Sequence, residues 1–259
     1  MPTPDRPPAA VPVVGTGWRV PGLPAIAGRP AVIVPVVVGE DAPARAGEAV
    51  RAGADVVEWR IDLVADAARA VREIPAVRAA CGAAPLLVTY RTTAEGGSGA
   101  AGPAGYAEML LAAARAGADL LDVEADHPAA ADAVAGIRAG RDGAGPAIVM
   151  SHHRFDATPP AREIVERLAA MEAAGADVAK LAAMPTRWSD VLDLLAATAA
   201  RAEEARVPLV TMSMGTLGAP SRLVGGRFGS AATFASAGDV SAPGQMPVAE
   251  VLRALDLLA

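Results

Sequence analysis

Residues 174–184 read AGADVAKLAAM, and the first four letters, AGAD, also occur at 52–55 and 116–119. Each copy follows an alanine-rich stretch with helical spacing and precedes a run of apolar residues. Glycine suits the position just after a helix because it adopts a positive φ without strain. The repeat therefore predicts a helix that stops at the glycine and a strand that follows it.

The same alternation continues along most of the chain. Short apolar runs rich in β-branched residues are separated by alanine-rich segments, which is typical of parallel strands joined by helices. Eight such strands predict an α/β protein with a (β/α)8 (TIM) barrel. A doubly wound open sheet is the alternative, although no GxGxxG follows the first strand. The predicted strands span 31–38, 55–62, 85–91, 119–125, 147–153, 177–184, 208–214 and 232–238, and the clearest helices span 104–117, 162–175, 189–205 and 247–258.

Length and composition limit the class of protein. The 259 residues suffice for one barrel domain over 31–259, preceded by an extended or disordered Pro/Gly-rich arm over 1–30. A net charge of −6 and 3% aromatic residues argue against nucleic-acid binding. The chain has no apolar run long enough for a membrane span, and its start does not resemble a signal peptide. The one cysteine, Cys81, cannot form an internal disulfide, so we expect it in the core and the protein in the cytoplasm.

Polar residues gather at the ends of the predicted strands, where a barrel of this kind places its active site. In EWRID (58–62), Glu58 and Arg60 share one strand face, and Trp59 lies on the other face, toward the core. A structural ion pair is the simpler interpretation of Glu58 and Arg60 alone, and a capping or solvated role is the simpler one for His152 and His153. Other polar groups stand at or after later strands: Arg91, Glu95, Asp122, Glu124, Lys180 and Arg222. We expect Asp122 and Glu124 to be ion-pair partners at the barrel rim.

Lys180 is the only lysine among 23 basic residues, and it lies inside an apolar, strand-like run. A snorkelling surface lysine is one interpretation, and a Schiff-base lysine is the other. An amine must be neutral to attack a ketone, and apolar surroundings disfavour the ammonium and lower its pKa. His153, at the end of the neighbouring strand, is a suitable base for the carbon beside the imine. The sequence has no HxH, HExxH or cysteine cluster, so we expect no metal.

With these residues in view, the chain from about residue 31 to 257 resembles type I 3-dehydroquinate dehydratases, the Schiff-base class. The resemblance rests on short stretches that occur in the family's order. They are EWRID (58–62), TYRTTAEGG (89–97), MSHHRFDATP (150–159), GADVAKLAAMP (175–185), TMSMG (211–215), SRLVGGRFGSAATF (221–234) and SAPGQM (241–246).

The resemblance implies a role for each matching residue. Lys180 forms an imine with the ketone of 3-dehydroquinate, His153 moves the protons, and Glu95 orients His153. The residues implied to bind substrate are Glu58, Trp59, Arg60, Arg91, Arg222, Ser241 and Gln245, with Arg222 on the carboxylate and Ser241 and Gln245 on a lid. No cofactor is implied. The expected protein is a cytoplasmic, homodimeric lyase of the shikimate pathway, which leads to chorismate and the aromatic amino acids.

Two positions depart from the family pattern. His152 stands where tyrosine is common, and Arg154 stands where aspartate is common. His152 is expected to point away from the site if the strand is regular. Another Schiff-base barrel of the aldolase type, with phosphate-binding loops after the seventh and eighth strands, is one alternative. A ligand-binding barrel without activity is the other.

Overall fold

The computed structural model describes residues 20, 23–36, 41–140, 145–238 and 242–259. Its strands form one parallel sheet in the order β7-β6-β5-β4-β3-β2-β1-β8. The sheet curls into a nearly closed barrel, because β7 and β8 meet through a bridge between Leu209 and Ser230 and a 2.7 Å backbone hydrogen bond from Ala231 to Leu209. The strands are β1 (Ala31–Val36), β2 (Val56–Arg60), β3 (Leu86–Thr89), β4 (Leu120–Glu124), β5 (Ala147–Arg154), β6 (Val178–Ala183), β7 (Leu209–Ser213) and β8 (Ala232–Phe234).

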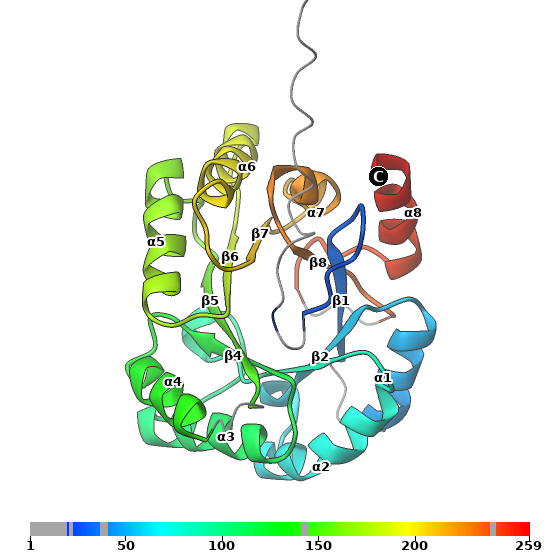
Figure 1. Ribbon diagram of the computed structural model, residues 1–259, viewed down its shortest axis with the longest axis vertical. Helices are drawn as coiled ribbons and strands as arrows, with labels where there is room; N and C mark the ends of the chain where they lie inside the picture. Colours follow the sequence, from blue (N-terminus) through cyan, green and yellow to red (C-terminus); the bar gives the residue numbers. More distant parts are fainter. Residues whose placement is uncertain (1–19, 21–22, 37–40, 141–144, 239–241) are drawn as a thin grey trace, which may run out of the picture.

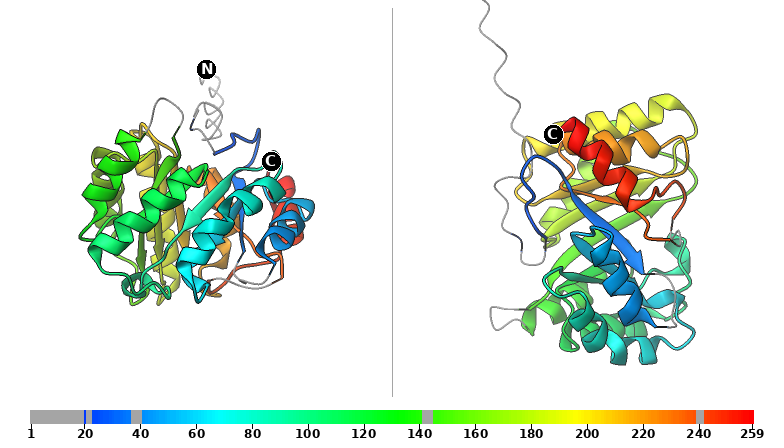
Figure 2. Two further views of the ribbon diagram at one scale, coloured as in Figure 1. Left: turned by 90° about the horizontal axis from the view of Figure 1, so that it is seen from below. Right: turned by 90° about the vertical axis from the view of Figure 1, so that its right-hand side faces the viewer.

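Helices follow the strands in turn and form the outer layer of the barrel (Figure 1). The last helix, α8, lies on the same outer side as β1 and α1, so the two ends of the barrel sequence meet there (Figure 2). No helix in these described ranges is long and apolar enough to cross a membrane. The helices are α1 (Ala42–Arg51), α2 (Ala67–Ala80), α3 (Pro103–Arg115), α4 (Ala130–Ala139), α5 (Ala161–Ala173), α6 (Trp188–Ala202), α7 (Ala219–Val224) and α8 (Val248–Leu258).

The predicted (β/α)8 barrel is confirmed, and the open doubly wound sheet is wrong. All eight predicted strands are present. Residues 37–38 of the first predicted strand lie outside the described residues, and the next six strands differ from the prediction by at most two residues at either end. The eighth ends at Phe234 instead of residue 238, because the chain turns away there and Ser236 forms only an isolated bridge with Pro247. The four predicted helices lie within three residues of α3, α5, α6 and α8.

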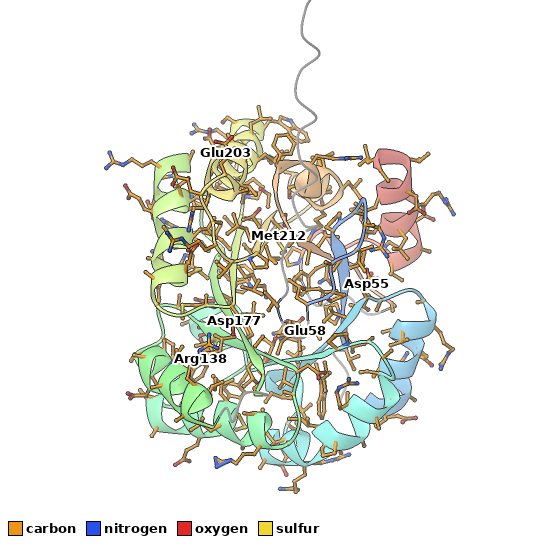
Figure 3. All side chains as sticks on the ribbon, in the orientation of Figure 1. Asp55, Glu58, Arg138, Asp177, Glu203 and Met212 are labelled. Carbon is orange, nitrogen blue, oxygen red and sulfur yellow. The ribbon has the colours of Figure 1, made fainter. Side chains whose placement is uncertain are left out.

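The three AGAD copies build the same corner three times. Their glycines adopt φ values of 105°, 100° and 96°, which confirms the predicted helix stop. Each following aspartate accepts the backbone N–H of a residue at the start of the preceding strand and forms an ion pair with an arginine. The pairs are Asp55 with Val32 (2.8 Å) and Arg29 (2.6 Å), Asp119 with Leu86 (2.7 Å) and Arg78 (2.6 Å), and Asp177 with Ile148 (2.8 Å) and Arg138 (2.9 Å). Each AGAD copy therefore holds the start of its own strand against the preceding strand. Figure 3 shows one of these pairs, Arg138 and Asp177, lying close together.

Strand side chains alternate between two apolar layers. One layer fills the barrel, and the other lies between the strands and the helices, where Cys81 is buried as predicted. Of the predicted N-terminal arm, Val20, Leu23 and Ile26 pack against the layer inside the barrel. Arg29 forms an ion pair with Asp55, which directly precedes β2. The described part of this arm therefore closes the barrel at the amino-terminal ends of its strands.

Candidate active site

A cavity of about 100 Å³ lies among residues that end the strands or follow them. A space of this size accommodates several water-sized groups, which suits a small molecule. Glu58 and Met212, which line the cavity, both point into the interior of the barrel in Figure 3. The sequence candidates that line it are Glu58, Arg60, Arg91, Glu95, His153, Lys180, Arg222 and Gln245.

His153 and Glu95 form a close pair in the cavity wall. Nδ1 of His153 lies 2.8 Å from Oε2 of Glu95, and the same oxygen accepts the backbone N–H of His153 at 3.1 Å. Burial lowers the pKa of His153 well below its usual value, and the positive charges of Arg91 and Lys180 lower it further. Burial raises the pKa of Glu95 to about 8, although Arg91 opposes this shift. The imidazole is therefore neutral near pH 7 and is held through Nδ1, which leaves Nε2 as the free ring nitrogen.

Lys180 lies between polar and apolar surroundings. Lys180 is 4% exposed, and its Nζ is 3.1 Å from Oδ2 of Asp122 and 4.7 Å from the centre of the Phe234 ring. A smaller apolar cavity, lined by Leu23 and Ile33 among others, lies on the other side of Lys180. The lysine thus forms part of the floor of the polar cavity and does not snorkel to the surface.

Arg91, which lines the cavity, connects three buried carboxylates, those of Glu95, Asp122 and Glu124. Nη1 lies 3.1 Å from both Glu95 and Glu124, and Nη2 lies 2.8 Å from Asp122. Thr92 donates its backbone N–H (2.7 Å) and its hydroxyl (2.6 Å) to Glu124. Asp122 and Glu124 are ion-pair partners as predicted, but they are 1% and 2% exposed and lie in the barrel floor, not at its rim.

The second strand contributes two polar side chains to the cavity. Glu58 accepts the hydroxyl of Thr89 at 2.8 Å. Arg60 forms a bidentate ion pair with Asp62, with donor–acceptor distances of 2.8 Å for both hydrogen bonds. The ion pair considered for Arg60 therefore forms with Asp62 and not with Glu58. Both Glu58 and Arg60 remain part of the cavity lining, and their spare acceptors and donors suit ligand hydroxyls.

Arg222 is a buried cation whose hydrogen bonds go to weak or neutral acceptors. It is 1% exposed, and its guanidinium donates to the carbonyls of Phe234 (3.5 Å) and Pro243 (3.1 Å) and to the sulfur of Met212 (3.6 Å). Within the described part of the chain, Nε has no hydrogen-bond partner and no carboxylate pairs with the side chain. Burial lowers the pKa of Arg222 to about 10, so the group remains charged near neutral pH. A buried, unpaired guanidinium facing a cavity favours an anionic ligand.

Two other predicted residues, Trp59 and His152, lie outside the cavity lining, and a third is not among the described residues. Trp59 is fully buried in the layer between barrel and helices and does not line the cavity, so its assignment to substrate binding is corrected to a core role by strand alternation. Ser241 lies outside the described residues. His152 does not line the cavity, as predicted, and its Nδ1 is 3.0 Å from Asp126.

Part of the apolar lining was not predicted from the sequence. Met212, Met214, Ala182 and Phe234 line the cavity, and their inward-facing positions on or directly after their strands could have indicated this. It also did not place Asp122 against Lys180. Among the residues that the structure describes, no group of three or more His, Cys, Asp or Glu side chains is arranged to hold a metal ion.

The fold and cavity define a (β/α)8 barrel with a polar site at the carboxyl ends of its strands. Residues 31–259 match the family model for type I 3-dehydroquinase, and the chain belongs to this family of enzymes. It is 41% identical over 218 residues to 3-dehydroquinate dehydratase of Klebsiella pneumoniae subsp. pneumoniae, covering 81% of this chain and 85% of that protein. It is 44% identical over 208 residues to the enzyme of the same name from Listeria monocytogenes serotype 4a, covering 79% and 82%.

Solved structures give the same result. The chain superimposes on 3-dehydroquinate dehydratase from Geobacillus kaustophilus with a TM-score of 0.82 and 37% identity, over 88% of this chain and 91% of that one. The type I enzyme from Clostridium difficile, solved with covalently modified comenic acid, gives a TM-score of 0.80 and 35% identity over 89% and 93%. The resemblance drawn from the sequence is therefore confirmed.

Proposed function

We propose that this protein dehydrates 3-dehydroquinate to 3-dehydroshikimate through a Schiff base on Lys180. The observation that carries the proposal is the juxtaposition of three groups in one small cavity. Lys180 provides a nucleophilic amine, His153 provides a neutral base, and Arg222 provides a buried cation without a carboxylate partner in the described residues. A small ketone that carries a carboxylate and hydroxyl groups uses all three.

The lysine acts as nucleophile and electron sink. Its neutral amine attacks the C3 carbonyl carbon, and loss of water from the carbinolamine gives the imine. The protonated imine draws electrons from the neighbouring C–H bond, so the proton at C2 becomes acidic. Arginine cannot replace lysine here, since the guanidinium stays protonated.

His153 moves the protons. Once Glu95 is ionised and accepts Nδ1–H, the free Nε2 of His153 removes the C2 proton and gives an enamine. The same proton then passes to the C1 hydroxyl, which leaves as water while the carbon–carbon double bond forms. Hydrolysis of the imine releases a conjugated enone and restores the amine. Glu95 holds the imidazole and stabilises its protonated form.

The other cavity residues suit the rest of the substrate. The guanidinium of Arg222 binds the carboxylate, for which its planar fork is well shaped. Glu58, Arg60 and Arg91 bind ring hydroxyls, and Gln245 contacts the substrate from the loop before α8. We further propose, from the resemblance alone, that Ser241 belongs to this loop as a lid and that the enzyme is a cytoplasmic homodimer of the shikimate pathway.

The direct test is to incubate the purified protein with 3-dehydroquinate and follow formation of the enone by its ultraviolet absorbance. Turnover without added metal or cofactor supports the proposal. A rise in melting temperature with no product supports instead a ligand-binding barrel without activity. A phosphorylated sugar that is cleaved while 3-dehydroquinate is not would favour the aldolase alternative.

A further inference from the structure

Asp122 is the carboxylate beside the reactive amine. It is 1% exposed, and its Oδ2 lies 3.1 Å from Nζ of Lys180 and 2.8 Å from Nη2 of Arg91. Ser151 donates its hydroxyl to the other oxygen, Oδ1, at 2.6 Å. Among the described residues, no other carboxylate forms an ion pair with Lys180. A negative charge is therefore fixed next to Nζ.

Three partners keep this carboxylate ionised. Burial alone raises the pKa of Asp122, but Arg91, Lys180 and the hydrogen bond from Ser151 outweigh burial and hold the pKa below its usual value. Because Arg91 remains charged throughout, Asp122 stays anionic even when the lysine nitrogen is neutral. The carboxylate thus resists taking a proton from the lysine nitrogen.

The ring of Phe234 also stabilises a positive charge on Nζ of Lys180, through a cation–π interaction. Nζ of Lys180 lies over its ring at 4.7 Å from the centroid, and the face of an aromatic ring attracts a cation. Phe234 comes from β8, whereas Asp122 comes from β4, so the two features reach Nζ from separate parts of the barrel. Both stabilise a positive charge at this nitrogen and neither stabilises a neutral amine.

In the Schiff-base reaction the nitrogen of Lys180 carries a positive charge in the protonated imine. The neutral imine is a much weaker electron sink, so the C2 proton is acidic only while the nitrogen keeps its proton. We propose that Asp122 is the counter-ion that keeps the imine on Lys180 protonated, with the ring of Phe234 stabilising the same charge. This inference rests on the proposed function.

Cyanoborohydride provides the test, since it reduces a protonated imine far faster than a neutral one. The protein is incubated with 3-dehydroquinate and cyanoborohydride over a range of pH, and the fraction of irreversible adduct is measured by intact mass. We expect the pH at which trapping falls to half to lie at least about one unit lower in Asp122→Asn than in wild type. Asp122→Glu, which restores the charge, is expected to recover part of this shift.

Glu124→Gln is the matched control. Glu124 is buried on the same strand and also pairs with Arg91 (3.1 Å), but within the described residues its carboxylate contacts Arg91 and Thr92 and not Nζ of Lys180. We expect its half-trapping pH to stay within about half a unit of wild type, because its charge is lost at a greater distance from Nζ. An equal shift in both variants, or no shift in Asp122→Asn, overturns the counter-ion role.

Two results separate this inference from the proposed function. Wild-type protein that gives no adduct at any pH refutes the Schiff base itself. If Asp122→Asn does not fold, Phe234→Leu tests the same charge, since it removes the aromatic face and keeps every ionisable group. A smaller downward shift of the half-trapping pH is then expected, and an unchanged value overturns the inference.

Discussion

Oε2 of Glu95 lies 2.8 Å from Nδ1 of His153 and also accepts the backbone N–H of the same histidine at 3.1 Å. The carboxylate therefore fixes both the ring and the strand that carries it. Arg91 binds the same oxygen from the third side, at 3.1 Å. This arrangement keeps the histidine in one orientation while burial and nearby cations keep it neutral.

Replacing Glu95 by glutamine tests what the charge of this pair contributes. The amide oxygen still accepts Nδ1–H, but the carboxylate charge that forms when Glu95 ionises, and that stabilises the imidazolium, is lost, so the pKa of His153 falls further. We expect kcat to fall by about tenfold to a hundredfold, because a weaker base removes the proton more slowly. The acid limb of the pH profile of kcat is expected to move to lower pH. An acid limb that moves to higher pH contradicts this role for Glu95.

The two adjacent histidines are expected to differ in effect. His153→Ala removes the base that lines the cavity and is expected to lower kcat by about a hundredfold to ten thousandfold. His152→Ala removes a side chain bound to Asp126 outside the cavity lining, and we expect less than about tenfold. Steady-state rates with 3-dehydroquinate measure both. The reverse order would assign the base to His152.

Arg222→Gln tests binding of the substrate carboxylate. Loss of a buried cation that pairs with a ligand carboxylate costs about 2–5 kcal/mol, so KM is expected to rise by at least about thirtyfold. Arg227→Gln is the matched control, since Arg227 lies five residues later and its Nη2 donates to the carbonyl of Ala259 at the surface. Unchanged KM in Arg222→Gln, or an equal rise in both variants, would show that the carboxylate is bound elsewhere.

The AGAD corners predict a stability effect away from the site. Asp119→Ala removes a 2.7 Å hydrogen bond to the backbone of Leu86 and an ion pair with Arg78. Such bonds to a charged group contribute about 1.5–3 kcal/mol, and we expect the free energy of unfolding to fall by about that amount. Asp156→Ala, which breaks the exposed pair with Arg154, is expected to lower the free energy of unfolding much less, because solvent screens this pair. Urea denaturation measures both, and equal losses would contradict a special role for the corner.

The sequence predicted the fold well because the same local signal recurs. Three glycines with positive φ and eight apolar runs mark where helices stop and strands begin, and both depend on nearby residues alone. Lys180, His153 and Arg222 could be placed together because strand ends converge at one side of a barrel.

The interior contacts could not be predicted in the same way. Asp122 was expected at the rim, but Arg91 reaches across from β3 and Lys180 from β6 to compensate its charge, so it is stable in the barrel floor. The buried position of Asp122 thus depends on residues that are 31 and 58 positions away in the chain. Trp59 was included with Glu58 and Arg60 through the EWRID motif, yet strand alternation turns it into the outer layer. A motif marks a stretch of chain, whereas the pleat decides which of its side chains reach the ligand.

The central claim is that Lys180 forms a covalent imine with the substrate. Intact mass after incubation with 3-dehydroquinate and borohydride, followed by peptide mapping, tests it most directly, since the only competing amine is the N-terminus. We predict one ligand-sized adduct on the peptide that contains Lys180, absent in Lys180→Ala and Lys180→Arg, both of which are expected to fold and to lack turnover. A folded wild-type protein with no adduct, or wild-type rates in either variant, would contradict the account.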